Sequence, residues 1–436
     1  MHLGTLVDGI AASHPDRVAL IEGDESTTYA DLVRAAESFA DGLRAADVPV
    51  GARVPWTGEA GRAAAAAVLG TARHGAALAL LNPRLTDGER ATLVAHLGGR
   101  MEQPDETVVL FTSGTTGLPK PVAFTHATVL GRIRTFATPV GDAAQVRLLC
   151  APIHHVGGLL GLLVSLAGGH TTVVQPRFEA GEWLRLVEVH RVAISFVVPA
   201  MLERVLDHPD FGRRDLTSLT SLSYGAAPMR ADLIDRAVAA LPHVGFSNTF
   251  GQTETLGGIT VLTADDHRDP ARRTSLGRAL PGVALRVIEP DTDADVTDGE
   301  PGELLVHGPH TDGWVRTGDL VRRDADGYLY SVGRLRDTIN RGGEKFGPVE
   351  VEEVLRGHPS IADVAVAGVP DPELGERVGA AIVVRGGGDT RALAEWCRGR
   401  IAQYKVPDRI VVVDAIPYTD LGKVDRRAVV RLVEGG

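Results

Sequence analysis

The feature that most limits the fold of this chain is an alternation of short, β-branched runs with longer helical stretches. A helical stretch over 63–74 leads into an apolar run at 77–81, and a further helical stretch covers 86–97. More strand–helix pairs follow at 171–207 and 219–241. Because helices that alternate with strands usually cross over between parallel strands, this order predicts an α/β fold with largely parallel sheets.

The pattern changes after residue 283. Short strands are predicted at 285–288, 302–308 and 328–332, separated by turn residues, which indicates a small β-rich subdomain. A second boundary is predicted near 333–337. At 436 residues the chain exceeds one ordinary core, so we expect two or three domains.

The last hundred or so residues have the size of a small separate domain. We expect a helix from Val349, strands at 361–367 and 379–384, a helix at 390–401 and a last strand at 409–413. This mixture predicts a compact α+β unit.

Composition excludes several classes of protein. The formal net charge of −11 argues against a nucleic-acid partner. Two cysteines, Cys150 and Cys397, lie far apart without metal-ligand spacing, which is typical of a reducing cytoplasm. The weakly polar run 156–169 is shorter than a membrane span, so it predicts a core helix. The N-terminus lacks the pattern of a signal peptide.

Residues 112–120 combine four hydroxyl side chains, two glycines and one lysine directly after a buried strand. Hydroxyls and exposed backbone N–H groups bind phosphate oxygens, and glycines let the backbone approach them. The spacing differs from a Walker loop, because two residues separate the glycines and Pro121 follows Lys120. The segment therefore predicts a phosphate site of another type.

Five further segments share this chemistry, at 224–228, 248–255, 314–320, 333–348 and 417–423. The first is a turn of small residues, the second and third each contain one carboxylate, the fourth runs through the predicted domain boundary, and the last ends in a lysine. In this order and spacing, and together with the phosphate loop, they resemble the acyl-adenylate-forming superfamily. That superfamily includes acyl- and aryl-CoA synthetases, adenylation domains of peptide synthetases and luciferases. The similarity extends over nearly the whole chain.

The resemblance implies a reaction and a domain plan. A carboxylate attacks the α-phosphate of ATP, and the acyl-adenylate then passes its acyl group to CoA. ATP, Mg²⁺ and CoA are the implied cofactors. A large AMP-binding domain over 1–335, with α/β sheets and the β-rich subdomain, would precede a small, mobile α+β domain over 337–436. The hinge between them maps to Arg336.

The nucleotide site is also implied by the resemblance. The β- and γ-phosphates would contact Thr112, Ser113, Gly114, Thr115, Thr116 and Lys120. The adenine slot would comprise Gly225, Ala226, Ala227, Pro228 and Phe250, flanked by Asn248, Thr249 and Gly251. The ribose would bind Asp319, with Arg334 beside it; a carboxylate can accept hydrogen bonds from two hydroxyl groups.

The remaining implied roles are catalytic. Lys423 would bridge the substrate carboxylate and the α-phosphate, Thr253 would contact that phosphate, and Glu254 with Thr115 would bind Mg²⁺. His155 would gate the acyl pocket. The pocket would be lined by His155, Val156, Gly157, Tyr224, Gly251 and Gly257. Pantetheine would pass Gly342 and Gly343.

The leading hypothesis is an ATP-dependent carboxylic acid:CoA ligase. One alternative passes the activated acid to a carrier-protein thiol, an amine or an anion such as nitrite, and another is a non-catalytic adenylate-binding protein. The substrate acid could be an aryl, a short aliphatic or a dicarboxylic acid. The oligomeric state is also open, with a homodimer as one possibility. The chain departs from the family's pattern in a shortened N-terminal domain, between Leu97 and Asp105, and in Pro121, where glycine is usual.

Overall fold

The computed structural model describes residues 2–112, 119–137, 144–227, 229–309, 311, 313–385, 390–419 and 423–435. Contacts divide the chain into two compact units. The first comprises residues 1–273, 280–283 and 308–312, and the second comprises 274–279, 284–307 and 313–436. The expected α/β class, with sheets in separate parts, is confirmed. The domain plan with a hinge at Arg336 stays a prediction.

The large sheet of the first unit has the strand order β12-β11-β10-β9-β7-β8-β1-β2. The run from β11 through β10, β9, β7 and β8 to β1 pairs in parallel, whereas β2 and β12 pair antiparallel with their neighbours. The strands are β1 (Val18–Glu22), β2 (Glu25–Thr28), β7 (Val146–Leu149), β8 (Thr171–Val174), β9 (Ile194–Val197), β10 (Ser221–Gly225), β11 (Gly245–Gln252) and β12 (Gly257–Leu262).

A smaller sheet of the first unit has the order β3-β4-β5-β6. Its strands are β3 (Arg53–Thr57), β4 (Ala77–Leu81), β5 (Glu106–Thr112) and β6 (Lys120–Thr125). A buried ion pair, Arg53 Nε to Glu106 Oε2 at 2.9 Å, joins β3 to β5. Glu106 also accepts the backbone N–H groups of Glu102 and Gln103. The pair therefore closes the short connection that precedes β5.

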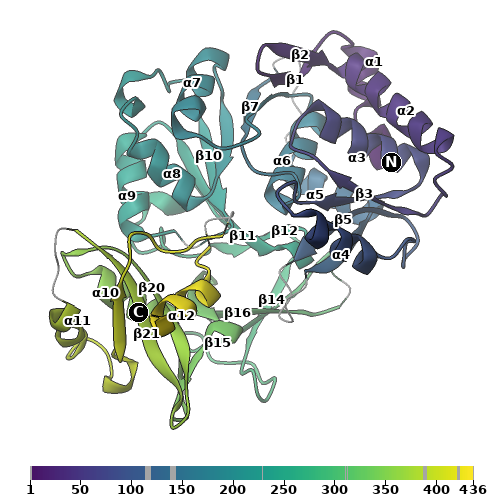
Figure 1. Ribbon diagram of the computed structural model, residues 1–436. Helices are drawn as coiled ribbons and strands as arrows, with labels where there is room; N and C mark the ends of the chain where they lie inside the picture. Colours follow the sequence, from purple (N-terminus) through teal and green to yellow (C-terminus); the bar gives the residue numbers. More distant parts are fainter. Residues whose placement is uncertain are drawn as a thin grey trace. The chain divides into compact units, whose positions relative to one another are not determined.

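Helices pack against both sheets of the first unit. Figure 1 shows α7, α8 and α9 together beside β10, where Trp183, Leu202 and Ile234 share one core with Leu222. The α-helices are α1 (Asp8–Ser13), α2 (Tyr29–Ala45), α3 (Arg62–His74), α4 (Asp87–Leu97), α5 (His126–Phe136), α6 (Val156–Ala167), α7 (Ala180–His190), α8 (Pro199–Leu206) and α9 (Ala231–Ala240). The 3₁₀ helices are η1 (Leu3–Thr5), η2 (Phe211–Arg213), η3 (Thr253–Thr255) and η4 (Asp266–Arg268).

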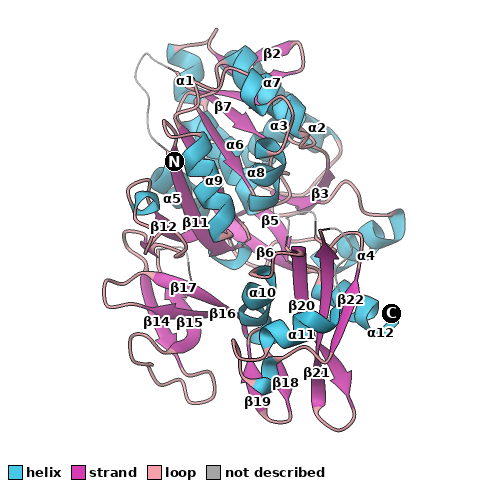
Figure 2. Ribbon diagram, turned by 90° about the vertical axis from the view of Figure 1, so that its left-hand side faces the viewer, coloured by secondary structure: helices cyan, strands magenta, loops and turns pink. Residues whose placement is uncertain are grey.

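The second unit contains two sheets, which Figure 2 shows with their strands in magenta. One is antiparallel in the order β14-β15-β16-β17, and the other runs β19-β18-β21-β20 with β22 parallel to β21. The strands of these two sheets are β14 (Ala284–Ile288), β15 (Pro301–His307), β16 (Val315–Arg323), β17 (Leu329–Arg334), β18 (Ile339–Arg341), β19 (Glu344–Phe346), β20 (Ile361–Asp371), β21 (Gly375–Val384) and β22 (Arg409–Val412). The two-residue strand β13 (Arg278–Ala279) also lies in this unit. The helices are η5 (Leu335–Asp337), α10 (Pro348–Arg356), α11 (Thr390–Cys397), η6 (Gln403–Lys405) and α12 (Arg426–Gly435).

The second unit differs from expectation in its helices. The predicted helix over 390–401 ends at Cys397, because Gly399 follows in the left-handed region with φ 88°. Helix α12 was not predicted, because arginines interrupt its apolar pattern. Its buried residues are Val429 and Val433, which lie one turn apart. No helix in the described ranges has the length and apolar character that crossing a membrane requires.

Candidate active site

The phosphate segment lies on a hairpin of the first unit. Strand β5 ends at Thr112, β6 begins at Lys120, and these two residues face each other in the antiparallel register. Four predicted phosphate ligands, Ser113, Gly114, Thr115 and Thr116, lie outside the described residues. Pro121 faces Phe111 in β6, the last strand in the order of its sheet, and an edge strand is where proline is tolerated.

A turn that contains Glu254 lies beside this hairpin. Strand β11 leads into η3, which holds Thr253 and Glu254 and contacts β5. The Thr255 hydroxyl accepts the Gln252 N–H at 3.2 Å and lies 2.8 Å from the Gly257 carbonyl, to which it donates. Glu254 itself is exposed. The structure therefore brings Thr112 and Glu254 onto neighbouring elements.

The predicted adenine residues lie at the ends of two parallel strands. Gly225 of β10 pairs with Thr249 of β11, and a Cβ at Gly225 would lie 2.5 Å from the Thr249 carbonyl oxygen. Only glycine permits that approach. Ala226 follows in the left-handed region with φ 67°, and Asn248 is buried. Pro228 lies outside the described residues, and Ala227 and Phe250 are half-buried.

Most of the predicted acyl-pocket positions are neighbours in the first unit. His155 precedes α6, whose first residues are Val156 and Gly157. A Cβ at Gly257 would lie 3.3 Å from a Val156 methyl group, and a Cβ at Gly251 would lie 2.0 Å from the Gly257 carbonyl oxygen. Small residues are thus required here by backbone packing as well as by any substrate.

Two aromatic residues qualify the pocket prediction. The Tyr224 hydroxyl lies 2.9 Å from Nε2 of buried His267, and the Tyr224 ring belongs to the core. Phe196 of β9, which was not predicted as a site residue, would lie 3.3 Å from a Cβ at Gly157 and 3.6 Å from one at Gly225. Phe196 therefore separates the start of α6 from the adenine turn.

Asp319 and Arg334 form an ion pair in the second unit. They face each other across β16 and β17, and Arg334 Nε lies 2.9 Å from Asp319 Oδ1. Burial raises the pKa of Asp319, while the positive charges of Arg334, Lys423 and Arg336 oppose that rise. Two other predicted functional residues, Arg334 and Lys423, and the predicted hinge residue Arg336 thus place positive charge near the Asp319 carboxylate.

Glu303 anchors the turn that presents Asp319. Its buried carboxylate accepts Arg316 Nε at 2.9 Å and the Gly318 N–H at 3.2 Å. Gly318 has φ 68°, and the Asp319 N–H bonds to the Thr317 hydroxyl at 3.1 Å. Sequence reasoning missed Glu303, although a glutamate within an apolar strand pattern is a signal that could have selected it.

The remaining predicted residues of the second unit lie on turns. The Lys423 carbonyl accepts the Thr419 N–H at 2.8 Å, just before α12. Gly342 and Gly343 connect β18 to β19 with φ values of 61° and 95°, and the Gly342 N–H bonds to the Leu374 carbonyl. Both glycines use backbone conformations that other residues rarely adopt.

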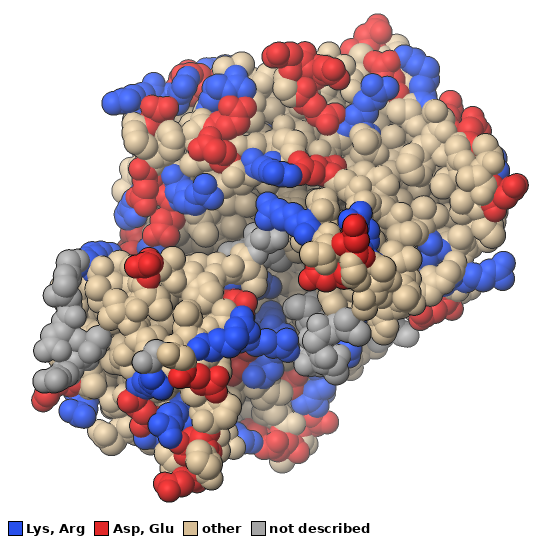
Figure 3. Space-filling view, in the orientation of Figure 1, with Lys and Arg blue, Asp and Glu red and all other residues tan. Residues whose placement is uncertain are grey.

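The donors available for a metal are hard oxygen atoms. Within the described ranges, no group of three or more His, Cys, Asp or Glu side chains could hold a metal ion. Mg²⁺, however, commonly binds one or two carboxylates together with substrate phosphates, so the Glu254 carboxylate beside a phosphate hairpin fits it. On the face in Figure 3, acidic and basic side chains are interspersed.

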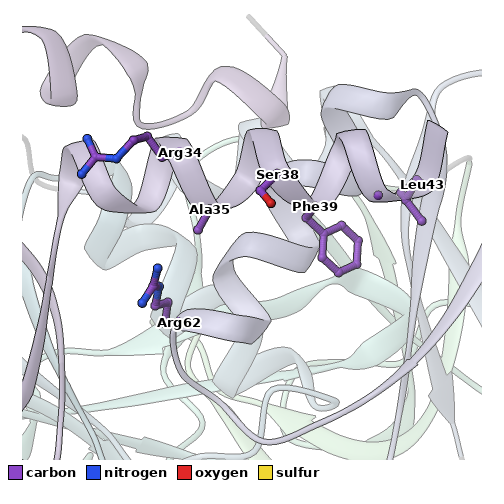
Figure 4. A pocket seen from close by; sticks show the side chains of 7 residues that line it. Arg34, Ala35, Ser38, Phe39, Leu43 and Arg62 are labelled. Atoms are coloured by element: carbon purple, nitrogen blue, oxygen red, sulfur yellow. The ribbon is translucent and has the colours of Figure 1, made fainter. Parts of the chain in front are cut away.

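Figure 4 shows the side chains that line a depression between α2 and α3. None of its lining residues belongs to the predicted adenylate site. They are Arg34, Ala35, Ser38, Phe39, Gly42, Leu43 and Arg62.

Comparisons with known proteins agree with this arrangement. The sequence profile of the AMP-binding enzyme family matches residues 7–101 and 99–312, and that of its C-terminal domain matches 350–423. A feruloyl-CoA synthase from Amycolatopsis is 33% identical over 479 positions, covering 95% of each chain. That alignment is longer than the 436 residues of this chain, which agrees with the shortening expected from the sequence.

Solved structures give the same result. The o-succinylbenzoate CoA synthetase of Bacillus subtilis, in complex with its acyl-adenylate intermediate, superposes with a TM-score of 0.86 at 25% identity, covering 97% of both chains. The amide bond synthetase McbA of Marinactinospora thermotolerans has a TM-score of 0.86 at 26% identity, covering 98% of this chain and 99% of that one. The chain belongs to the AMP-binding enzyme family, within the acyl-adenylate-forming superfamily.

Proposed function

We propose that the protein is an ATP-dependent carboxylic acid:CoA ligase that acts through an acyl-adenylate. The observation that carries the proposal is the adjacency, in the first unit, of the Thr112–Lys120 hairpin and the turn with Glu254. The family membership supports it. A phosphate-binding hairpin beside an exposed carboxylate suits a nucleoside triphosphate and the Mg²⁺ ion bound to it.

In the first half-reaction, a substrate carboxylate oxygen attacks the α-phosphorus of ATP. The bond to the β-phosphate oxygen breaks, and its electron pair leaves with pyrophosphate. Lys120 and the hydroxyl loop would hold the leaving group, and Lys423 would neutralise the charge that develops between the two anions. Mg²⁺, when held by Glu254 and Thr115, supplies further charge neutralisation at the phosphates.

Asp319 would accept hydrogen bonds from the ribose hydroxyls. Its ion pair with Arg334 fixes the carboxylate before the nucleotide arrives, so less conformational freedom is lost on binding. Thr253 would contact the α-phosphate, and the backbone around Gly225 would face the adenine. These roles remain proposals residue by residue.

In the second half-reaction, the CoA thiol attacks the acyl carbonyl carbon, and the bond to the AMP oxygen breaks. We infer that residues 337–436 rotate about Arg336 between the two steps. This motion would withdraw Lys423 and present Gly342 and Gly343 to pantetheine, whose narrow arm suits a backbone without side chains.

The name of the Amycolatopsis relative makes an aromatic acid the first substrate to test. His155 and Val156, at the start of α6, would border that acid. A second acceptor deserves a parallel assay, because the amide bond synthetase resembles this chain over nearly its full length. An amine would then replace the CoA thiol. Free, buried cysteines are compatible with a cytoplasmic location.

A two-stage assay tests the proposal. Pyrophosphate exchange is measured over aryl, aliphatic and dicarboxylic acids, and AMP release is then measured with CoA, with an amine or with neither. We expect exchange with at least one acid and faster AMP release with CoA. Exchange that only an amine accelerates would move the function to amide synthesis. ATP binding without exchange for any acid would favour a non-catalytic protein.

A further inference from the structure

Arg132 of α5 is a buried arginine that none of the roles above uses. The residue is 2% exposed. Its helix packs against α6, and its guanidinium lies next to Gly257 of β12. Burial lowers the pKa of Arg132 to about 10, and no carboxylate of the described residues offsets this effect. The guanidinium is therefore still charged at neutral pH, and burial of a charge without a counter-ion is costly. Such a cost needs a compensating role.

The partners of Arg132 are two carbonyl groups of one turn. Its Nε donates to the Leu256 oxygen at 2.9 Å, and Nη2 donates to the Gly258 oxygen. The intervening Gly257 oxygen accepts the Thr255 hydroxyl. Three successive carbonyl groups thus each have a side-chain donor.

This turn is strained. Leu256 is fully buried and has φ 47°, which costs a non-glycine residue free energy, and Gly257 follows with φ 96°. Glycine adopts such a φ freely, but leucine keeps it only where the surroundings fix it. The two hydrogen bonds from Arg132 supply that constraint.

The position of the turn connects it with the phosphates. Leu256 lies two residues after Glu254, and its N–H bonds to the Thr253 carbonyl at 2.8 Å. Arg132 lies on the helix that begins directly after β6, the strand that starts with Lys120. One side chain therefore joins the helix after the phosphate hairpin to the turn that carries the magnesium-binding candidate.

We propose that Arg132 is a positioning residue that fixes the Glu254 turn and thereby sets the affinity of the protein for magnesium-bound ATP. The proposal rests on the assignment of Glu254 to Mg²⁺ in the proposed function. It goes beyond that assignment, because Arg132 touches neither nucleotide nor metal and acts through the backbone of residues 256–258.

Isothermal titration of ATP, in Mg²⁺ and separately in EDTA, tests this without any substrate acid. The variants are Arg132→Lys, which keeps the charge but not the fork of donors, and Arg132→Met. The Mg²⁺ increment is the ratio of the ATP affinity in Mg²⁺ to that in EDTA. We expect both variants to reduce this increment about tenfold or more, which is usual for residues that orient metal ligands. Affinity in EDTA should change little.

Arg147→Met is the matched control. Arg147 of β7 is half-buried, and burial lowers its pKa. Its Nη2 lies 3.1 Å from His170 Nε2, away from the turn. Its loss should reduce thermal stability but leave the Mg²⁺ increment intact. A double variant, Arg132→Lys with Glu254→Gln, should bind no more weakly than Glu254→Gln alone, because both act at one group.

The proposal is overturned if the Arg132→Lys variant folds and keeps the full Mg²⁺ increment, or if the double variant shows additive losses. It is also overturned if Mg²⁺ adds no ATP affinity to the wild-type protein. A failure of the proposed function has a different signature: no acid supports pyrophosphate exchange, while the Mg²⁺ increment and its dependence on Arg132 persist.

Discussion

Two turns of this molecule present a carboxylate, and they are anchored by opposite charges. In the first unit, the cation of Arg132 donates to the carbonyl groups of Leu256 and Gly258. In the second unit, the anion of Glu303 accepts the Gly318 N–H and the Arg316 guanidinium. Carbonyl oxygens accept from a cation in the first turn, and an N–H donates to an anion in the second. A buried charged side chain thus bonds to the turn backbone in both units.

The presented carboxylates differ as well. Glu254 is exposed, which suits a group that must reach a hydrated cation, whereas Asp319 is buried beside Arg334. A buried carboxylate loses hydration and is tolerated only where cations replace it. The Asp319 carboxylate therefore depends on surrounding positive charge, whereas the exposed Glu254 carboxylate does not. The following variants test that difference.

The largest effect is expected for Lys423→Ala. If Lys423 neutralises the developing charge as proposed, its loss should slow adenylation by roughly a hundredfold or more. Pyrophosphate exchange at saturating ATP and acid measures this loss. Lys345→Ala is the control, because Lys345 is an exposed lysine of the same unit, 3.8 Å from Asp291. Equal losses in both variants would contradict a specific role for Lys423.

Asp319→Asn should weaken ATP binding and yet preserve or raise stability at neutral pH. Loss of the charged hydrogen bonds proposed between Asp319 and the ribose should cost about tenfold or more in affinity. Burial raises the pKa of Asp319, so the folded protein binds this proton more tightly than the unfolded chain does. The ionised carboxylate hence costs stability above its pKa, and that cost disappears as the pH falls through it.

Thermal denaturation from pH 8 downward checks this sign. The advantage of Asp319→Asn over the wild type should be greatest at pH 7–8 and shrink toward the ordinary range of aspartate, about pH 4. Asp298→Asn, which removes an exposed partner of Arg323, should show no such trend. A variant that is least stable relative to wild type at neutral pH would show that the Arg334 ion pair outweighs burial.

Glu303→Gln tests the anionic anchor. The amide oxygen can still accept the Gly318 N–H, but the charge opposite Arg316 is lost, which should cost about 2 kcal/mol in the free energy of unfolding. Chemical denaturation measures this. Asp293→Asn removes the exposed second partner of the same arginine and should cost less than about 1 kcal/mol. Similar costs would show that the burial of Glu303 is irrelevant.

The sequence predicted the elements whose signals are local. Strand β4 was expected at its observed bounds, because five buried apolar residues end at Asn82-Pro83. A helix was predicted over 86–97, and α4 begins at Asp87, where the structure adds a capping box between Thr86 and Glu89. The order of motifs likewise indicated the family, which the comparisons show.

The anchors could not be predicted, because they are long-range. Arg132 meets Leu256 across 124 positions, and no local pattern distinguishes it from the arginines on helix surfaces. No strand was predicted at β18 or β19, because each has only three residues and Gly342 and Gly343 lie between them. Phe196 borders two predicted sites only because parallel pairing places β9 beside β10.

The smallest effect is expected for Thr255→Val, which tests the neutral part of the first anchor. Thr255 is buried, and its hydroxyl donates to the Gly257 carbonyl at 2.8 Å. Valine keeps the shape but not the hydrogen bond, so the free energy of unfolding should fall by about 1 kcal/mol. Thr172→Val, which removes an equally buried hydroxyl bonded to Ser165, should cost a similar amount without changing adenylation.

Thr255→Val should, in addition, raise the Mg²⁺ concentration needed for pyrophosphate exchange. The Glu254 turn would lose one of the three side-chain groups that donate hydrogen bonds to its carbonyl oxygens. This increase should be smaller than that caused by Arg132→Lys, since a neutral hydrogen bond is weaker than a charge-assisted one. If Thr255→Val instead destabilised the protein as much as Glu303→Gln, charge would not be what distinguishes the anchors. The two turns would then differ only in how tightly their side chains pack.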